Sequence, residues 1–210
     1  MSTMRPHSFQ TAPQKRKAVY MQLRPLQQIL LILMLVLCHN TLRADTLSLA
    51  EAAQRTGTVV MIRHALAPGF GDPSHFDINR CDTQRNLDDR GRRQSKAIGQ
   101  AMRDAGFETR GIISSPWCRC MDTAELMDLG AVEAFDGLSS FFQDHAPRGY
   151  TLKRLRDRLA RVQPNDPPLI MVTHQVVISA ITGQGTRSGG AVLYDPRTDQ
   201  AVALEMPPTP

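Results

Sequence analysis

The chain has 210 residues, which suits one domain of ordinary size preceded by a leader segment. Its formal net charge is +5, from 25 Lys and Arg residues against 20 Asp and Glu residues. Six of the basic residues and none of the acidic ones fall in residues 1–44, so the rest of the chain has 19 basic residues against 20 acidic ones. That balance gives no support to a nucleic-acid footprint and excludes nucleic-acid binding as the function.

Residues 1–44 have the pattern of a secretory signal peptide. A basic stretch is followed by the unbroken apolar run Ile29–Cys38 and by a polar segment that ends at the small residue Ala44. We expect cleavage after Ala44, with Met21 as an alternative start of translation, and hence a periplasmic or secreted protein. Spanning a bilayer takes about 20 apolar residues, so no stable membrane insertion is expected after cleavage. An uncleaved anchor and a lipidated Cys38 are the alternatives.

Beyond the leader, short β-type runs alternate with helical patterns, which predicts a domain over residues 45–205. The predicted strands are Thr58–Ile62, Gly111–Ser115, Ala131–Phe135, Leu169–Thr173 and a hairpin of Ala191–Tyr194 with Ala201–Leu204. The predicted helices are Leu47–Arg55 with a Ser48 cap, Asp88–Ala105, Trp117–Met127, Leu152–Val162 with a solvated basic face, and Gln175–Thr182. Residues 65–86 are expected to form a long loop, and residues 206–210 a frayed tail. Strands separated by helices indicate the α/β class, a three-layer α/β/α sandwich with a mostly parallel central sheet.

Three cysteines follow the leader: Cys81, Cys118 and Cys120. An exported protein can keep a disulfide, and an odd number leaves at least one thiol. Cys118 and Cys120 are two apart on a predicted helix and point to different faces, so they should not pair with each other. Two alternatives remain open: a disulfide from Cys81 to Cys118 or Cys120, and three unpaired thiols. A zinc site is a weak alternative, because it needs three or four suitably spaced ligands.

Ionisable side chains follow three of the predicted strands. Arg63 and His64 end the first, Arg119 lies just after the second, and His174 ends the fourth. Ligands of such sheets bind outside the carboxyl ends of the strands, so these four side chains should converge there. A single histidine after a strand is more often structural, whereas two histidines and two arginines at one sheet edge indicate a site.

These residue types suit phosphate chemistry. A phosphoryl dianion needs fixed cations, and the planar fork of arginine matches its oxygens. A helix N-terminus beside Arg119 would add backbone donors. A neutral imidazole is a competent nucleophile near pH 7, and a second, protonated imidazole can stabilise charge on the transferred group. Such a reaction requires no metal, so no metal ligands or cofactors are expected.

At these residues the chain resembles the histidine phosphatase superfamily, in the branch that includes phosphoglycerate mutases and small phosphatases. The matching segments occur in family order and are Val60–Ala65, Leu87–Gly91, Ser114–Arg119 with Thr123–Ala124, and Val172–His174. The resemblance covers about residues 57–194 and implies a phosphoglycerate mutase-like fold. It also implies that His64 becomes a transient phosphohistidine that water hydrolyses, with Arg63, Arg119 and His174 lining the phosphate pocket.

The sequence departs from the family pattern at the proton donor. The family often has a Glu between the second arginine and the second histidine, and residues 135–145 contain none. Asp144 is the candidate general acid, with a loop or capping role as the alternative. Arg85 in the long loop and Gln175 beside the second histidine are candidate substrate-binding residues. Phe76, Phe141 and Phe142 could form apolar pocket walls, although core packing explains them equally well.

We therefore expect an exported phosphatase that hydrolyses small-molecule phosphate monoesters. The alternative is a catalytically weak or inactive module of the cell envelope that binds a phosphorylated ligand. The residues do not predict the substrate or the oligomeric state. Loop residues 65–86 and 136–150 should shape the pocket, since loops at this edge of the sheet set specificity.

Overall fold

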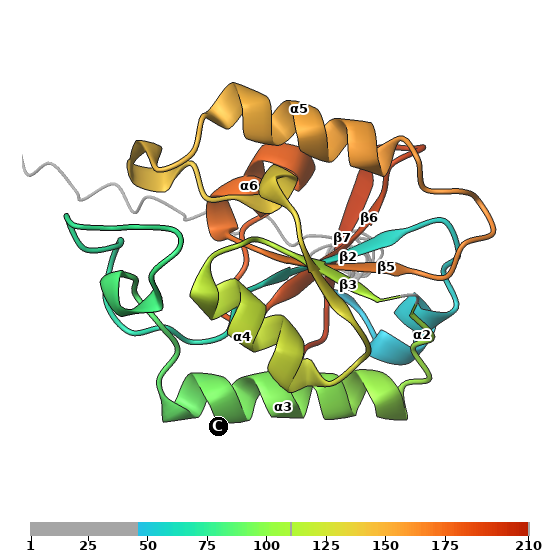
Figure 1. The fold of residues 1–210 in the computed structure, drawn as a ribbon. Coiled ribbons are helices and arrows are strands. Elements are labelled where there is room, and N and C mark those ends of the chain that lie inside the picture. Colours follow the sequence, from blue (N-terminus) through green and yellow to red (C-terminus); the bar gives the residue numbers. More distant parts are fainter. Residues whose placement is uncertain (1–45, 110, 210) are drawn as a thin grey trace, which may run out of the picture. The chain divides into compact units, whose positions relative to one another are not determined.

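In the part of the chain that the structure describes, seven strands form one mixed sheet in the order β1-β7-β6-β2-β5-β3-β4 (Figure 1). The strands are β1 (Thr46–Leu47), β2 (Val59–Arg63), β3 (Ile112–Ser114), β4 (Val132–Ala134), β5 (Leu169–Thr173), β6 (Ala191–Asp195) and β7 (Gln200–Leu204). The computed structural model describes residues 46–109 and 111–209, and the predicted leader lies outside the described residues. None of the helices in these segments has the length and apolar character needed to cross a membrane.

The centre of the sheet is parallel. β2 pairs with β5, and β5 pairs with β3, in parallel ladders in which Arg63 lies opposite Thr173 and Ser114 lies opposite Val172. The predicted hairpin is confirmed: β6 runs antiparallel to both β2 and β7. The carboxyl ends of β2, β3 and β5 therefore meet at one edge, which is where the sequence puts its ionisable residues.

Helices cover both faces of the sheet, as the predicted three-layer architecture requires. The helices are α2 (Leu49–Ala53), α3 (Asp89–Asp104), α4 (Cys118–Met127), α5 (Arg148–Leu159) and α6 (Gln175–Thr182). Alternate residues of β2 enter two separate cores: Val60 and Ile62 pack with α2, α3 and α4, whereas Val59 and Met61 pack with α5 and α6. In Figure 1, α5 and α6 lie on one side of the strands and α3 and α4 on the other. Burial on both faces explains why β2 and β5 are apolar without alternation.

Some helices begin at other residues than predicted, because backbone pairing or capping determines where they start. The first helix begins at Leu49, because Thr46 and Leu47 pair with β7 as a short strand. Ser48 caps that helix as predicted, in a capping box with Glu51. The helix α5 begins at Arg148 rather than at Leu152.

The chain end is held more firmly than the expected frayed tail. The carbonyls of Met206 and Pro207 accept hydrogen bonds from Arg187 Nη2, at 3.1 and 2.9 Å. The Thr209 hydroxyl accepts a hydrogen bond from Gln94 Nε2 at 2.9 Å. Composition alone gave no sign of these contacts, which come from residues far away in the sequence.

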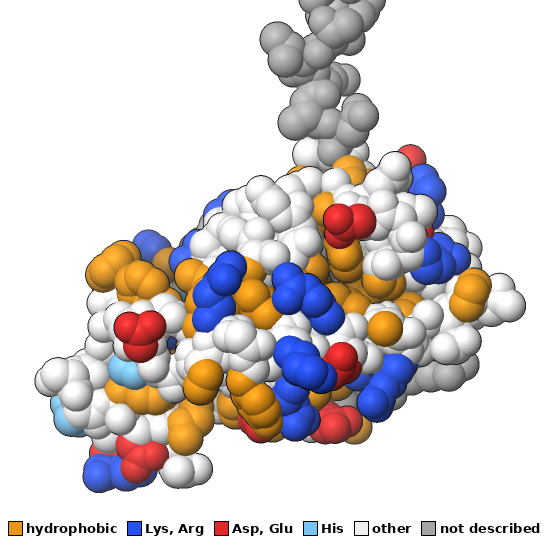
Figure 2. Space-filling view, turned by 90° about the horizontal axis from the view of Figure 1, so that it is seen from above, with side chains coloured by type: hydrophobic (Ala, Val, Ile, Leu, Met, Phe, Trp, Pro, Cys, Tyr) orange, Lys and Arg blue, Asp and Glu red, His pale blue; other side chains and the backbone are white. Residues whose placement is uncertain are grey.

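The basic face predicted for the helix over Leu152–Val162, which is α5, lies on the surface. Figure 2 views the molecule from the α5 side and shows Lys and Arg side chains gathered across this face. Lys153 pairs with Asp157 at 2.8 Å, and the Arg154 guanidinium lies over the rings of Phe135 and Tyr150. The exposed ion pair is typical of a solvated helix face and contributes little stability.

Close packing of α3 against α4 gives a test of the fold. A Cβ added at Gly99 would lie 1.9 Å from the Met127 carbonyl oxygen. We predict that Gly99→Ala lowers the free energy of unfolding by about 1–3 kcal/mol, because the helices must separate to admit the methyl group. Urea denaturation at pH 7 measures this.

Gly149→Ala is the matched control, because a Cβ at this helical position meets nothing within 4 Å. It should leave stability unchanged or raise it by about 0.5–1 kcal/mol, through the lower entropy of the unfolded chain. Equal stability of the two variants would contradict the close approach of α3 and α4.

Candidate active site

The two predicted histidines lie side by side at the ends of the two central strands. His64 follows β2 and His174 follows β5, directly after the paired residues Arg63 and Thr173. The backbone N–H of His64 donates to the Thr173 carbonyl at 2.9 Å. The two imidazole centroids are 5.6 Å apart. Strand register thus brings together two residues separated by more than a hundred positions.

Arg119 reaches the same place from the first turn of α4. The strand β3 ends at Ser114, and after Pro116 the chain turns into α4, which begins at Cys118. The Arg119 side chain is only 3% exposed. Together with Arg63, His64 and His174 it lines a cavity of about 390 Å³. The structure therefore brings together all four residues of the predicted constellation, and their catalytic roles stay predictions.

The hydrogen bond made by His64 defines which ring nitrogen carries the proton. Its Nδ1 lies 2.7 Å from the Ala65 carbonyl oxygen, which can only accept, so Nδ1 carries the hydrogen and Nε2 keeps its lone pair. Burial, and then the charge of Arg119, lower the pKa of His64 well below 6.5. The imidazole is therefore neutral at pH 7, the state that a nucleophile requires.

His174 is held by neighbours from the segment Ser114–Arg119. Its Nε2 lies 2.8 Å from the Ser115 hydroxyl, and its ring packs edge-on against Trp117. Burial, followed by the charge of Arg119, lowers its pKa well below 6.5 as well. Both imidazoles are thus uncharged in a pocket whose positive charge comes from arginine.

Two guanidinium groups in this pocket keep donors without partners. The Nε atoms of Arg63 and Arg119 are buried and make no hydrogen bond. Arg63 is anchored through Nη1, which donates to the Thr186 carbonyl at 2.9 Å. Buried donors cost free energy unless they are satisfied, and both guanidinium groups line the cavity, so the site suits a ligand with several acceptor oxygens.

An acidic residue that the sequence analysis did not single out completes the cluster. Asp72 accepts hydrogen bonds from Arg119 Nη1 at 2.7 Å and Nη2 at 3.1 Å, and its side chain is 3% exposed. Burial raises its pKa, but the hydrogen bonds and charge of Arg119 outweigh this and leave the pKa below the ordinary value. No local pattern could have revealed Asp72, because its partner is 47 residues away in the sequence.

The predicted substrate-binding residues both line the cavity, in different ways. Arg85 is held by the carbonyls of Gly71 and Ala67. Burial, and then the charge of Arg119, lower its pKa. The Gln175 amide is already occupied: Oε1 accepts from the Thr186 N–H at 2.8 Å and Nε2 donates to the Ser179 hydroxyl at 2.9 Å. Gln175 therefore braces a neighbouring turn in this state.

The structure does not bring Asp144, the candidate general acid, to the cavity. It is exposed and has a positive φ of 57° in the short turn Phe142–Asp144. None of the described residues that line the cavity carries a carboxyl group. The neighbouring Gln143 contacts the site region instead, accepting a hydrogen bond from the Asp72 N–H at 2.7 Å.

The mouth of the cavity is apolar. Phe70, 90% exposed, and Phe142, 37% exposed, pack edge to face with centroids 5.2 Å apart, and both line the cavity. Of the three phenylalanines considered from sequence, Phe142 alone lies here. Phe76 stacks on Trp117 and on the His145 ring, and Phe141 packs against the core beside α5 and α6.

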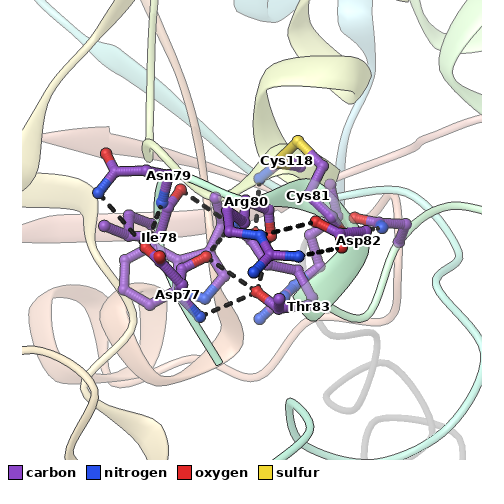
Figure 3. Close-up of a disulfide and its surroundings, with 12 residues drawn as sticks. Asp77, Ile78, Asn79, Arg80, Cys81, Asp82, Thr83 and Cys118 are labelled. Atoms are coloured by element: carbon purple, nitrogen blue, oxygen red, sulfur yellow. Dashed lines mark hydrogen bonds and ion pairs between the residues drawn. A yellow bond between two sulfur atoms is a disulfide. The ribbon is translucent and has the colours of Figure 1, made fainter. Parts of the chain in front are cut away.

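The open choice of disulfide partner is resolved in favour of Cys118. Cys81 and Cys118 are bonded, and Figure 3 shows the bond joining the loop around Asp77–Thr83 to the start of α4. Gln84 Oε1 also accepts a hydrogen bond from the Cys118 N–H at 3.0 Å. Cys120 is free and buried, and burial raises its thiol pKa to about 12. The long loop is therefore tied to the residue directly before Arg119.

The described residues form neither a metal cluster nor a second hollow with comparable chemistry. Among residues 46–109 and 111–209, no group of three or more His, Cys, Asp and Glu side chains is arranged to hold a metal ion. A larger hollow of about 880 Å³ lies beside Leu47, Arg55 and β7. Its Asp195 and Arg197 pair with each other at 2.8 Å, and none of the described residues that line it has a buried side-chain polar atom without a hydrogen-bond partner.

Comparison with known proteins agrees with the class that the fold and site define, an α/β protein with paired histidines at adjacent strand ends. Residues 59–139 match the model of the histidine phosphatase superfamily (branch 1). The resemblance carried by the sequence motifs is therefore confirmed, and the fold is the phosphoglycerate mutase-like fold of that superfamily. A comparison with curated proteins found no match to the chain.

Three solved structures are similar to this chain at low sequence identity. A candidate phosphohistidine phosphatase SixA from Agrobacterium tumefaciens is 20% identical, with 72% of this chain and 98% of that chain covered and a TM-score of 0.50. A mycobacterial glucosyl-3-phosphoglycerate phosphatase in complex with inorganic phosphate is 15% identical, with coverages of 70% and 94% and a TM-score of 0.49. The α-ribazole phosphatase from Shigella flexneri is 16% identical, with the same coverages and TM-score. The first likeness shows a shared fold.

The buried neutral histidines predict acid sensitivity. Because their folded-state pKa values lie well below 6.5, the unfolded chain takes up protons first as the pH falls. Stability should therefore be full above about pH 6.5 and decrease as the pH falls towards the folded-state values. Urea denaturation at pH 7, 6 and 5 should show this decrease, and a smaller one in His64→Asn. His75→Asn, which changes an exposed imidazole, should keep the wild-type slope; an unchanged slope in His64→Asn would contradict the prediction.

The disulfide predicts a redox-dependent stability. Cys81 and Cys118 are 37 positions apart, and closing a loop of that length restricts the unfolded chain. Replacing both by Ser should lower the free energy of unfolding by about 2–4 kcal/mol. A reductant should lower the melting temperature of the wild type and leave that of the double variant unchanged. A similar response of both proteins would show that the bridge is not formed.

Proposed function

We propose that this protein is an exported, metal-independent phosphatase that hydrolyses phosphate monoesters through a phosphohistidine on His64. One observation carries the proposal: His64 is neutral with a free Nε2 lone pair, and it shares a cavity with two guanidinium groups whose Nε donors have no partner. A nucleophile and an unsatisfied anion site in one cavity are the two requirements of phosphoryl transfer to a side chain.

The reaction proceeds in two displacements. In the first, His64 Nε2 forms a bond to phosphorus while the bond to the ester oxygen breaks, and the departing oxygen takes a proton from solvent or from the pocket. Arg63 and Arg119 balance the charge on the transferred group, and His174, protonated once the dianion is bound, adds to that stabilisation. In the second, water attacks phosphorus, the bond to Nε2 breaks, and inorganic phosphate leaves with His64 restored.

Export is supported by two independent features. The leader has the signal-peptide pattern, and the Cys81–Cys118 disulfide suits an oxidising compartment such as the periplasm or the cell exterior. The apolar mouth formed by Phe70 and Phe142 makes an aryl phosphate a suitable first probe, because its ring can contact both side chains.

A second function, phosphate-ligand binding without turnover, is favoured by one observation. The described residues that line the cavity include no carboxyl group that could protonate the leaving oxygen. General acid catalysis typically contributes about 10²–10⁴-fold, so a site without it would be slow with poor leaving groups. Binding and catalysis therefore have to be measured separately.

The decisive experiment traps the proposed intermediate. The leaderless protein is mixed with an aryl phosphate labelled in the phosphoryl group, quenched, and analysed for a labelled adduct stable to base and labile to acid, as expected of a phosphohistidine. We expect the adduct on His64, together with steady phosphate release that falls by about 10³-fold or more in His64→Ala. His75→Ala serves as the control for an exposed histidine.

The outcomes separate the two functions. Turnover and adduct that both disappear in His64→Ala support the phosphatase. Tight binding of inorganic phosphate without turnover in the wild type would replace it by the binding module. Turnover that persists in His64→Ala would refute the assignment of the nucleophile.

A further inference from the structure

Asp72 has the most heavily hydrogen-bonded carboxylate in the site region. Oδ1 accepts from Arg119 Nη1 at 2.7 Å and from the Arg85 backbone N–H at 3.0 Å. Oδ2 accepts from Arg119 Nη2 at 3.1 Å and from Trp117 Nε1 at 3.2 Å. Four donors from three residues thus converge on one carboxylate whose side chain is 3% exposed. Such saturation fixes the carboxylate in one orientation.

This arrangement determines how Arg119 can meet a ligand. Both terminal nitrogens of the guanidinium bind Asp72, whereas Nε is buried and without a partner. A bidentate pair holds the guanidinium plane in a defined orientation. Arg119 lines the cavity, so a phosphoryl oxygen would meet its guanidinium in an orientation that Asp72 has already set.

Asp72 also sets the charge of the pocket. The guanidinium groups of Arg63, Arg85 and Arg119 contribute three positive charges, and the Asp72 carboxylate removes one, which leaves two. Before a ligand binds both histidines are neutral, so this surplus of the ligand-free site equals in size the charge of a phosphate monoester dianion. Without the carboxylate the site would hold three positive charges and would bind the ground-state dianion more strongly.

Asp72 is not a proton donor in this arrangement. Its pKa lies below the ordinary value because Arg119 outweighs the effect of burial, and its oxygens already accept four hydrogen bonds. A general acid needs the opposite, a raised pKa and a proton directed at the leaving oxygen. The carboxylate can act only through the residues that it holds.

We propose that Asp72 is a positioning residue that orients Arg119 for the transition state and limits the positive charge that the ligand-free pocket presents to the incoming dianion. The inference rests on the proposed phosphatase function. Asp72 lies in a loop outside the motifs that carry the family resemblance. The proposal is that it controls the orientation of Arg119, which lies inside one of them.

The test is Asp72→Asn, which keeps the shape of the side chain and removes its charge. With an aryl phosphate, kcat should fall by about 10–100-fold, because a misplaced catalytic group is costly. Inhibition by inorganic phosphate should stay as strong or become stronger, because the pocket gains positive charge. A residue that only supports the fold would instead weaken phosphate binding and lower the melting temperature together with kcat. That result would overturn the proposal.

Two further measurements separate positioning from acid catalysis. The loss of kcat in Asp72→Asn should be similar for aryl and alkyl phosphates, whereas a much larger loss for alkyl phosphates would assign Asp72 as the proton donor and overturn the proposal. In a double-mutant cycle with Arg119→Lys, Asp72→Asn should have little further effect, because both changes disrupt the same pair. Full additivity of the two losses would show that Asp72 does not act through Arg119.

Matched variants control for the fold and the loop. Asp82→Asn removes an exposed carboxylate of the same loop, paired with Arg80, and should leave kcat unchanged. If Asp72→Asn does not fold, Gln143→Ala tests the proposal instead. This variant removes the exposed side chain whose Oε1 accepts a hydrogen bond from the Asp72 N–H. We expect kcat to fall severalfold at an unchanged melting temperature. An unchanged kcat in Gln143→Ala would then overturn the proposal.

The two proposals can fail separately. A wild-type protein that turns over through His64, with Asp72→Asn equally active, would refute only the role of Asp72. A wild-type protein without turnover would refute the phosphatase, and with it the inference that depends on it.

Discussion

The buried ion pair between Asp72 and Arg119 is the interaction on which the rest of the site depends. A guanidinium that is 3% exposed at the start of a helix would be strongly destabilising without a partner. Asp72 supplies the opposite charge from the loop that follows β2, and Trp117 donates to the same carboxylate. Cys118, which lies between Trp117 and Arg119 in the sequence, is bonded to Cys81 of that loop. Three consecutive residues of the α4 start are thus tied to one loop, which closes the cavity over the strand ends.

Arg119 also contributes, after burial, to the neutral state of the histidines. After burial, its charge is the largest cause that lowers the pKa of both His64 and His174. The same guanidinium therefore anchors the loop, keeps two imidazoles neutral and leaves one donor without a partner. These effects depend on one another, because a guanidinium without Asp72 would be free to turn away from the imidazoles. Because all these effects depend on the buried Arg119 guanidinium, a change at this one residue is expected to disturb the loop, the histidines and the anion site together.

The parts predictable from the sequence are those encoded by local patterns. Apolar runs and caps identify β2, β5 and α3, and parallel topology then brings His64 and His174 to one edge. Contacts made by side chains between distant segments are not encoded in that way. Asp72 reaches Arg119 across 47 positions, whereas Asp144, expected from its place between the motifs, lies exposed in a turn. The cysteine partner likewise depended on which residue of α4 faces the loop.

The distribution of carboxylates bears on which esters the site could cleave. Asp72 is saturated by donors, and the described residues that line the cavity add no other carboxyl group. The departing oxygen would then take its proton from water or from His174, once that imidazole has taken up a proton from solvent beside the bound dianion. A leaving group that is stable as an anion needs this proton least. The chemistry of the pocket and its aromatic mouth of Phe70 and Phe142 therefore point the same way, to esters whose leaving group is acidic and apolar.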